Sequence, residues 1–367
     1  MKMRKVILAM DSFKGCMSSV EANRAAADGV RSVWPGAEVV EVPVSDGGEG
    51  FLEAFRAAIG GELVTIPVKD PLLRNISARY LLNGETAVVE IAEAIGLTLL
   101  SPEERNPMTA SSYGVGQLVA DAVKNGARHI LVGLGGSATS DAGKGMLQAL
   151  TDVFGQCFLA VSASTATAAP TIPPSIRFTI ATDVDNPLYG ENGAAQVFGP
   201  QKGAMPEMVR LLDNAARQFA DDSARQMGFD RSQMKGAGAA GGLGYAFMQY
   251  LDAHRKSGIE LLLETIGFDA MARDADLIIT GEGSADSQTL MGKLPMGILR
   301  HSAGVPVCLL AGKVRDRQEL LRAGFAYVES INPSGLPLEE AMKKTVAEEN
   351  IRRFFRNNAD CQTNSRR

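Results

Sequence analysis

Short polar loops that combine glycine with carboxylates recur along the sequence, and each follows an apolar segment. They cover residues 11–15, 45–50, 135–145, 182–187 and 280–287. Glycine lets backbone N–H groups approach an anion closely, and a helix that begins after the loop adds a favourable dipole. A carboxylate in such a loop would repel a bare phosphate, but it can hold Mg²⁺ or accept the proton of a substrate hydroxyl. The combination therefore favours phosphoryl transfer.

Turn formation is the alternative explanation for any one of these loops. Strand-to-helix connections carry Gly and Asp for turn geometry and helix capping alone, and for a single loop this reading fits equally well. The same loop character recurs in five loops, all at predicted strand ends, and this recurrence favours the functional reading.

The elements that must position these loops alternate between strands and helices. Apolar runs rich in β-branched residues predict buried strands at residues 6–10, 39–44, 87–91, 129–134, 178–181, 277–280 and 305–310. Helices are expected from Ser18, where Glu21 completes a capping box, towards Trp34, over residues 109–125, and after Pro206. This alternation predicts an α/β fold with parallel sheets covered by helices, in which ligands bind at the carboxyl ends of the strands.

Composition narrows the class of protein. A length of 367 residues favours two domains. The net charge of −5 argues against a nucleic-acid partner, and the scattered cysteines and histidines form no zinc set by spacing. Because no secretory signal and no membrane-length apolar stretch is visible, we expect no membrane partner and a cytoplasmic location with reduced thiols.

Several segments are not expected to carry the chemistry their patterns suggest. The G-x-G-x-x-G pattern at residues 236–241 follows a polar segment instead of a strand, so it does not predict a dinucleotide site. The sequence also has no Walker A loop, since the Gly-Lys pair at residues 143–144 is followed by glycine. Residues 162–169 read as a surface excursion and residues 357–367 as a frayed tail.

At these loops the sequence resembles the bacterial glycerate kinase family of the glycerate 2-kinase type. The resemblance extends from Asp11 to about Ile331 and rests on motifs in a fixed order. They are Asp-Ser-Phe-Lys-Gly at 11–15, Pro-Val-Ser-Asp-Gly-Gly-Glu-Gly at 43–50, Gly-Leu-Gly-Gly-Ser-Ala-Thr at 133–139, Thr-Asp-Val-Asp-Asn-Pro-Leu at 182–188, Phe-Gly-Pro-Gln-Lys-Gly-Ala at 198–204, the glycine-rich segment 236–244, and Ile-Thr-Gly-Glu-Gly at 279–283.

The resemblance implies both a fold and a reaction. It implies a flavodoxin-like parallel-sheet domain built from residues 1–66 and 289–367, and an inserted α/β domain at residues 67–288 whose core is similar to restriction endonucleases. The active site is then expected in the cleft between the domains. The implied reaction is ATP-dependent phosphorylation of D-glycerate to 2-phosphoglycerate and ADP, with ATP and Mg²⁺ as cofactors. Whether the chain is a monomer or a homo-oligomer is left open.

A kinase for a small hydroxy acid needs a phosphate cradle, a metal, a base and a cationic anchor, and we assign these roles to residues of the family motifs. The catalytic residues are Asp183, Asp46 and Lys202, where Asp183 is the first choice for the base or metal ligand and Lys202 neutralises the transferred group. The substrate-binding residues are Lys14, Gly47, Gly48, Asn186, Asp286 and Lys293. The residues for nucleotide and phosphate are Gly135, Gly136, Ser137, Gly238, Gly241 and Gly242. The metal ligands are Asp183 and Glu282.

Other readings of the same residues stay open. Each carboxylate could be a structural cap, and Lys202 could be a solvated surface lysine. The whole chain could be a non-catalytic regulator that binds nucleotide or sugar acid, a dehydrogenase using the segment 236–241, or a kinase of a related hydroxy acid. The sequence departs from the family pattern at Met10, Ser140 and Ser284-Ala285, and the last two border the predicted site, where they bear on substrate preference or rate.

Overall fold

The computed structural model describes residues 3–13, 15–45, 47–48, 50–155, 176–291 and 293–357. Within it the chain divides into two compact units. Unit 1 comprises Met1–Asp46, Glu53–Ile59 and Ile259–Arg367, and unit 2 comprises Gly47–Leu52 and Gly60–Gly258. The predicted surface excursion at 162–169 lies outside the described ranges, as does all but the first residue of the predicted tail.

Unit 1 is built on a parallel sheet of five strands in the order β2-β1-β9-β10-β11. The strands are β1 (Lys5–Met10), β2 (Glu38–Glu41), β9 (Leu277–Ala285), β10 (Val307–Val314) and β11 (Tyr327–Ser330). Counted in chain order within the unit, this is the order 2-1-3-4-5 of flavodoxin-like sheets. Its order reverses between β1 and β9, and ligands of such sheets bind outside the strand ends at that point.

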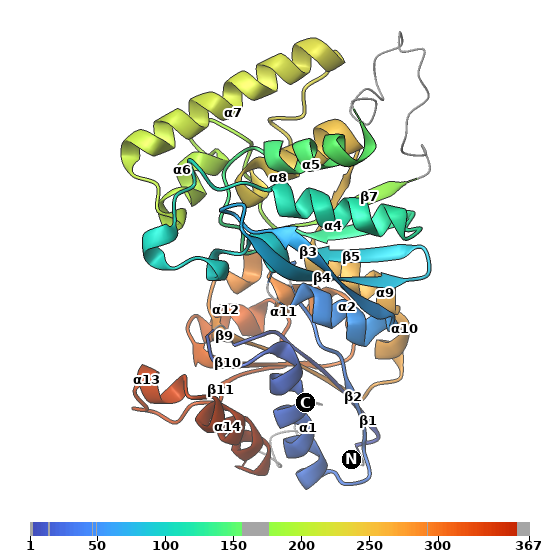
Figure 1. The fold of residues 1–367 in the computed structure, drawn as a ribbon. Helices are drawn as coiled ribbons and strands as arrows, with labels where there is room; N and C mark the ends of the chain where they lie inside the picture. Colours follow the sequence, from blue (N-terminus) through green and yellow to red (C-terminus); the bar gives the residue numbers. More distant parts are fainter. Residues whose placement is uncertain are drawn as a thin grey trace. The chain divides into compact units, whose positions relative to one another are not determined.

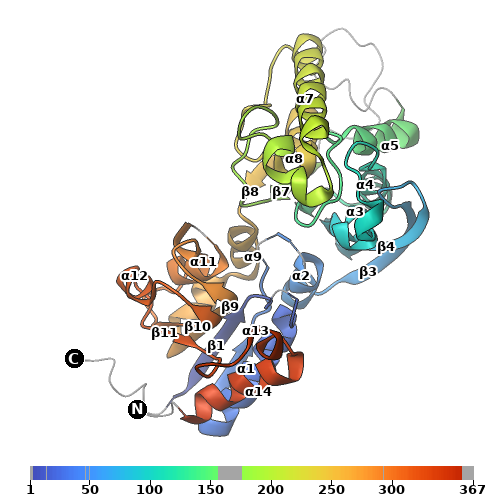
Figure 2. The same ribbon diagram turned by 90° about the vertical axis from the view of Figure 1, so that its left-hand side faces the viewer.

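The helices of unit 1 cover this sheet. They are α1 (Ser19–Val33), α9 (Gly258–Ile266), α10 (Phe268–Arg273), α11 (Leu294–Arg300), α12 (Arg317–Arg322), α13 (Leu338–Ala341) and α14 (Lys344–Asn357), with the 3-10 turn η5 (Thr289–Met291). Helices α1 and α14 lie side by side (Figures 1 and 2). At their contact a Cβ on Gly29 would come within 2.4 Å of the ring of Phe355, so only glycine allows this approach. The capping box of Ser18 and Glu21 begins α1 as predicted.

Unit 2 holds a mixed sheet of six strands in the order β3-β4-β5-β6-β7-β8. The strands are β3 (Glu62–Lys69), β4 (Asn75–Asn83), β5 (Thr86–Glu90), β6 (His129–Gly133), β7 (Arg177–Ala181) and β8 (His254–Lys256). Strands β3, β4 and β5 pair antiparallel, whereas β5 to β8 pair in parallel. The parallel part contributes fully buried residues to the core, among them Val89, Val132 and Ile180.

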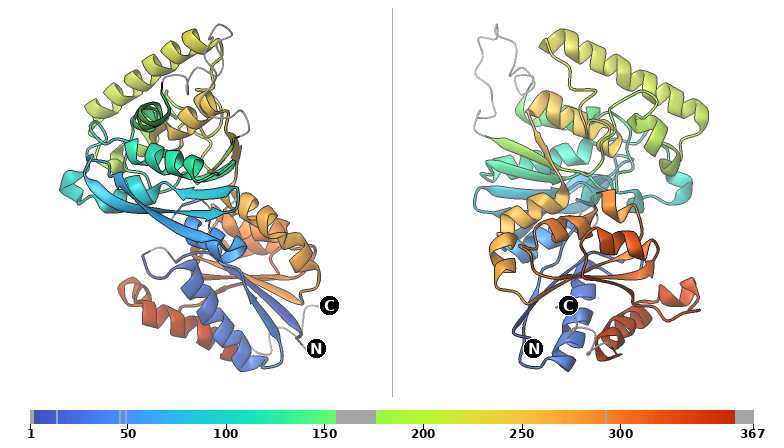
Figure 3. Two further views of the ribbon diagram at one scale, coloured as in Figure 1. Left: turned by 45° about the vertical axis from the view of Figure 1, so that its right-hand side comes forward. Right: turned by 180° about the vertical axis from the view of Figure 1, so that it is seen from behind.

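The helices of unit 2 lie against both the antiparallel and the parallel part of its sheet (Figure 3). They are α3 (Ala92–Ile95), α4 (Tyr113–Lys124), α5 (Lys144–Phe154), α6 (Ala194–Phe198), α7 (Pro206–Met227) and α8 (Ala239–Leu251), with the turns η1 (Leu97–Leu99), η2 (Pro102–Glu104) and η4 (Pro200–Lys202). Helix α2 (Phe51–Ile59) begins in unit 2 and continues into unit 1. No helix in the described part of the chain is both long and apolar enough to cross a membrane.

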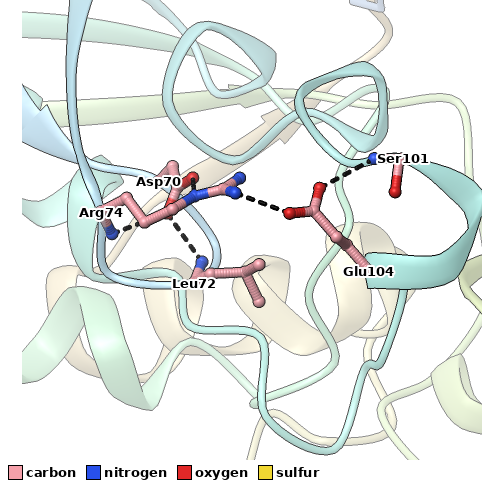
Figure 4. A network of polar contacts seen from close by, with 5 residues as sticks. All are labelled: Asp70, Leu72, Arg74, Ser101 and Glu104. Carbon is pink, nitrogen blue, oxygen red and sulfur yellow. Dashed lines mark hydrogen bonds and ion pairs between the residues drawn. The ribbon is translucent and has the colours of Figure 1, made fainter.

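A buried carboxylate holds the turn between β3 and β4 (Figure 4). Asp70 is 1% exposed and accepts hydrogen bonds from the backbone N–H groups of Leu72 and Arg74 and from the Arg74 guanidinium. The same guanidinium reaches Glu104 at 2.7 Å, and Glu104 accepts from the backbone N–H of Ser101. The turn of the hairpin is thereby tied to η2.

The predicted α/β class is confirmed, but several element boundaries are corrected. The strands β3 and β4 were not predicted, because β3 lies at the sheet edge and carries Pro67, which reads as a break. The loop predicted at residues 280–287 is largely strand, since β9 continues to Ala285 and pairs there with Val314 of β10. The helix expected at 109–125 begins later, at Tyr113.

The joints between the units also differ from the predicted ones at residues 67 and 288. Strand β3 pairs with β4 from Glu62 onwards, so this segment belongs to unit 2 before Pro67. Strand β9 lies between β1 and β10, so residues 277–285 belong to the sheet of unit 1 and not to the inserted domain. Hydrogen-bonded pairing decides both boundaries.

Candidate functional site

In unit 2 the predicted substrate glycines meet the loop after β6. The backbone N–H of Gly135 donates to the carbonyl of Gly47 at 3.0 Å. A Cβ on Gly135 would lie 2.2 Å from the Cα of Gly48, and one on Gly47 would lie 2.9 Å from the carbonyl oxygen of Ala181, the last residue of β7. The loop that contains Gly47 and Gly48 therefore lies against the carboxyl ends of β6 and β7, and a Cβ at Gly47 or Gly135 would not fit there.

Glu90, which the sequence analysis missed, holds the other end of this loop. It is the last residue of β5, is 7% exposed, and accepts hydrogen bonds from the backbone N–H groups of Gly50 and Leu52. A carboxylate at the end of a predicted apolar strand is the signal that could have found it.

Lys202 lies beneath the loop that follows β6 and is buried, with 3% of its surface exposed. Its Nζ donates to Ser137 Oγ at 2.9 Å and to the carbonyl oxygen of Thr139 at 2.6 Å. Gly136, one residue before Ser137, has a positive φ of 73° and is exposed. The reading of Lys202 as a solvated surface residue is therefore wrong, because the side chain supports the predicted phosphate loop from inside.

Burial changes the charge state of Lys202. Removal from water lowers the pKa of the Lys202 ammonium to about 7, although the negative charge of Asp141 acts in the opposite direction. Asp141 is itself held by Ser112 and by the backbone N–H groups of Gly143 and Gly145. Within the described part of the chain no carboxylate lies at ion-pair distance from Lys202. An anion bound at this loop would stabilise the charged form of the lysine.

The loop after β7 presents Asp183 to solvent and fixes its neighbours. Asp183 is exposed. Two residues later, Asp185 pairs with Lys235 and Arg255, each at 2.7 Å. Their hydrogen bonds and positive charge lower the pKa of Asp185. The Asn186 amide donates to the carbonyl of Asn192. The cations Lys235 and Arg255 were not singled out from the sequence, because neither lies in a glycine-containing loop after a predicted strand.

The glycines predicted to bind phosphate near α8 have a packing reason in the structure. Gly238, Gly241 and Gly242 are buried. A Cβ on Gly241 would lie 2.0 Å from the carbonyl oxygen of Thr139, and one on Gly238 would lie 2.3 Å from that of Pro187. The backbone N–H of Gly238 already donates to the carbonyl of Asn186. This segment therefore fastens the loops after β6 and β7 to each other, and its predicted contact with phosphate stays a prediction.

In unit 1 the ends of β1, β9 and β10 surround a cavity of about 410 Å³. Its polar lining includes Asp11 and Ser12 of the first motif, together with Glu282 and Lys293. Lys313 and Asn332 also line it. Asp11, Ser12, Lys313 and Asn332 were not among the predicted site residues, although each lies at or just after the end of a strand.

The predicted residues of unit 1 hold one another. Glu282 is 8% exposed and accepts a hydrogen bond from Thr289 Oγ1 at 2.6 Å, and its other carboxylate oxygen lies 3.9 Å from Lys293 Nζ. Asp286 accepts from the backbone N–H of Gln288 and so shapes the turn that leads into η5. Lys14 and Asp46 lie outside the described residues, so their predicted roles remain predictions.

The residues present allow a magnesium site at Asp183 more readily than at Glu282. Mg²⁺ in such sites takes one or two carboxylates, substrate phosphate oxygens and waters. Asp183 is an exposed carboxylate just after the end of a strand, and its oxygens can coordinate a cation. At Glu282, the nearby Lys293 ammonium would compete with a cation for the carboxylate. The described residues contain no cluster of three or more His, Cys, Asp or Glu side chains that could hold a metal.

Comparison with known proteins adds an independent observation. The model of a family described as the glycerate kinase family matches residues 6–362. A glycerate kinase of Bacillus subtilis (strain 168) is 39% identical over 355 residues, which cover 92% of this chain and 93% of that protein. The glycerate 2-kinase of Escherichia coli (strain K12) is 38% identical over 373 residues, covering 96% of both. A crystal structure described as a candidate glycerate kinase 2 from Salmonella typhimurium LT2 superimposes with a TM-score of 0.81 at 36% identity, over 98% of both chains.

Proposed function

The chain belongs to the glycerate kinase family, and we propose that it transfers the γ-phosphoryl group of ATP to the 2-hydroxyl of D-glycerate. The products are 2-phosphoglycerate and ADP. Family membership implies the use of ATP, and the relative named glycerate 2-kinase supports the choice of the 2-hydroxyl. The proposed Mg²⁺ shields the negative charge of the phosphates when it is bound.

The buried Lys202 is the observation that carries the proposal. A buried ammonium costs free energy unless an anion balances its charge. Its two acceptors, Ser137 Oγ and the carbonyl oxygen of Thr139, are neutral. A phosphoryl group on the exposed face at Gly136 would supply the missing negative charge. We therefore assign to Gly135, Gly136 and Ser137 the binding of phosphate, and to Lys202 the stabilisation of charge on the transferred group.

Asp183 is the proposed general base. It lies at the carboxyl end of β7, where a carboxylate can accept the proton of the attacking hydroxyl, and it is also the proposed magnesium ligand. Asp185 does not suit either role, because Lys235 and Arg255 already occupy its carboxylate. Asn186, Gly47 and Gly48 are proposed to contact the substrate.

In unit 1, Lys293 is proposed to bind an anionic group of a ligand, and Asp286 to accept a hydroxyl hydrogen bond. Glu282 orients Lys293 and Thr289 in this proposal instead of holding the metal. Lys14 and Asp46 keep their predicted roles in substrate binding and catalysis.

A coupled assay of ADP release tests the proposed function. With Mg-ATP present, we expect ADP release that depends on D-glycerate, saturates with it, and stops when EDTA removes the metal. A panel of related hydroxy acids should give kcat/KM values below that of D-glycerate. Nucleotide binding without turnover of any acid in the panel would instead support the non-catalytic regulator, and a better substrate in the panel would support a kinase of another hydroxy acid.

A further inference from the structure

The cavity of unit 1 lies where the strand order predicts a ligand. Strands β1 and β9 are neighbours in the sheet, but the chain continues from β1 to β2 on one side and from β9 to β10 on the other. In sheets of this kind, ligands bind outside the carboxyl ends of the two strands where the order reverses. Asp11 and Ser12 follow β1, Glu282 lies in the last part of β9, and Gly312 lies in that of β10. The volume of about 410 Å³ falls within the range of small-molecule sites.

One side of this cavity is apolar and only partly covered. Phe13 and Ile331 are buried at 4% and 6% exposure, whereas Met342 is 42% and Leu338 is 73% exposed. Ala347 of α14 completes this wall. The free energy falls when a flat apolar group covers exposed apolar side chains around a cavity, because apolar surface is then removed from water.

The other side of the cavity is charged. Asp11, Glu282, Lys293 and Lys313 line it. Asn332 also lines it and is held in place, because it donates to the carbonyl of Gly312 at 2.8 Å and accepts from Asn350 at 3.0 Å. The ligand must therefore combine an apolar surface with hydroxyl groups and negative charge.

Of the two small molecules in the proposed reaction, only the nucleotide has these properties. Every carbon of glycerate carries oxygen, so the acid has no apolar face to place on the wall. ATP joins a flat aromatic base to a ribose and a chain of phosphates. We propose that this cavity binds the adenosine part of ATP, with the base against Phe13, Leu338 and Met342 and the phosphate chain directed towards Lys293 and Lys313. The assignment rests on the proposed kinase function and places nucleotide-binding residues in unit 1, where the sequence analysis placed none.

Cys16 provides a probe inside the cavity. It lines the site and is partly exposed, whereas Cys308 is buried. Burial, together with the negative charges of Glu21 and Glu348, raises the pKa of the Cys16 thiol, so alkylation by N-ethylmaleimide is best followed at about pH 8.5. The rate at Cys16 is read by mass spectrometry of its peptide in the whole protein. We expect ADP to slow this rate about fivefold or more at saturation, and inorganic tripolyphosphate and D-glycerate to leave it unchanged.

A substitution in the exposed apolar wall of the cavity provides the second test. Leu338 is the first residue of α13, where an aspartate is favourable for the helix, so Leu338→Asp is expected to fold. The variant should raise the KM for ATP about tenfold and change the KM for D-glycerate less than about twofold. Val153→Asp, at an apolar residue of unit 2 that is 37% exposed, is the control and should change neither.

The two experiments distinguish an error in the adenosine assignment from an error in the proposed kinase function. Protection of Cys16 by ADP requires no turnover, so it can succeed even where D-glycerate is not phosphorylated. Protection by D-glycerate or tripolyphosphate to the same degree as by ADP would overturn the adenosine assignment. An unchanged KM for ATP in Leu338→Asp, in an enzyme that phosphorylates glycerate, would overturn it while leaving the kinase function intact.

Discussion

At the scale of single residues, the charge of Lys202 is the feature most closely linked to the proposed chemistry. Its ammonium lies below a glycine loop, bound to Ser137 and to the carbonyl of Thr139, and burial lowers its pKa to about 7. Above that pH the free protein loses the positive charge. A phosphate ligand would favour the charged form, so binding and protonation are coupled.

Replacement of Lys202 is expected to remove this charge with a large loss of rate. Lys202→Met should lower kcat about 10²- to 10³-fold, the range found when a donor to a developing negative charge is removed. In the wild-type protein kcat/KM for ATP should fall as the pH rises above about 7, because the ammonium then loses its proton. Lys202→Arg should weaken this decline, since a guanidinium stays protonated. Initial rates between about pH 6 and 9 measure all three effects.

Lys124→Met is the control for Lys202, because Lys124 is an exposed lysine on α4 of the same unit. Its rates should equal those of the wild type. A Lys202→Met protein that keeps more than about a third of the wild-type kcat would show that the buried lysine only supports the loop.

Asp183→Asn is expected to lower kcat about 10²- to 10⁴-fold, the contribution of a general acid–base group. Asn has nearly the same shape as Asp, so the melting temperature should stay close to that of the wild type. Asp185→Asn provides the comparison, because that carboxylate is paired with Lys235 and Arg255 and should affect kcat less than about tenfold. If the two variants lose activity equally, the proposed base is misassigned.

The sequence could predict which residues gather at the strand ends, but not which of them remain available to a ligand. Gly136 and Gly241 look alike in sequence, because both anion binding and close packing require a residue without a side chain. Only the structure distinguishes them, since Gly136 is exposed and a Cβ on Gly241 would meet Thr139. The burial of Lys202 was likewise not readable, because a single lysine in a short turn carries no periodic pattern.

At the scale of elements, hydrogen-bond pairing decides what local sequence leaves ambiguous. The central strands β1, β5, β6 and β7 were predictable from continuous apolar runs, as expected for strands buried on both faces. The edge strand β3 was not, because Pro67 lies within it. Proline is tolerated there since an edge strand has a partner on one side only. The capping box of α1 was predicted correctly because its signal is local.

The hairpin of β3 and β4 should depend on Asp70. Asp70→Ala removes the buried carboxylate that accepts from the backbone N–H groups of Leu72 and Arg74, and it is expected to lower the free energy of unfolding by about 1–3 kcal/mol. Urea denaturation of the variant measures the loss. Glu104→Gln, at the exposed end of the same network, should lower the free energy of unfolding much less than Asp70→Ala does. A loss in Asp70→Ala no larger than in Glu104→Gln would contradict the structural role of the buried carboxylate.

At the scale of the molecule, two units with separate cores and sheets make up the chain. The family resemblance indicated that one unit is built from both chain ends, but the joints could not be located, because composition does not change where the chain passes from one sheet to the other. Pairing of β9 with β1 assigns it to unit 1. Long-range pairing of this kind has no local signal.

The stability of unit 1 should depend on the protonation of His301. Burial alone would lower the pKa of His301, but hydrogen bonds to Glu260 and Asp269, both at 2.6 Å, outweigh it and raise the pKa. Because the pKa of His301 is higher in the folded protein, its contribution to the free energy of unfolding is complete below the unfolded pKa of about 6.5. This contribution is lost as the pH rises through the pKa of the folded protein. His301→Gln should therefore destabilise the protein at about pH 6, by up to about 1 kcal/mol, and have less effect at about pH 9. Thermal unfolding of both proteins across this range measures the difference, and an effect that grows with pH would contradict the sign.

Phosphorus NMR of the product formed from Mg-ATP and D-glycerate tests the central claim most directly. The spectrum reports in one measurement whether the γ-phosphoryl group is transferred and which oxygen of glycerate receives it. The account predicts that the wild-type protein produces 2-phosphoglycerate with an equal amount of ADP. A product that is only 3-phosphoglycerate would contradict the assigned hydroxyl, and the absence of any phosphorylated glycerate, with the ATP intact or merely hydrolysed, would contradict the proposed function itself.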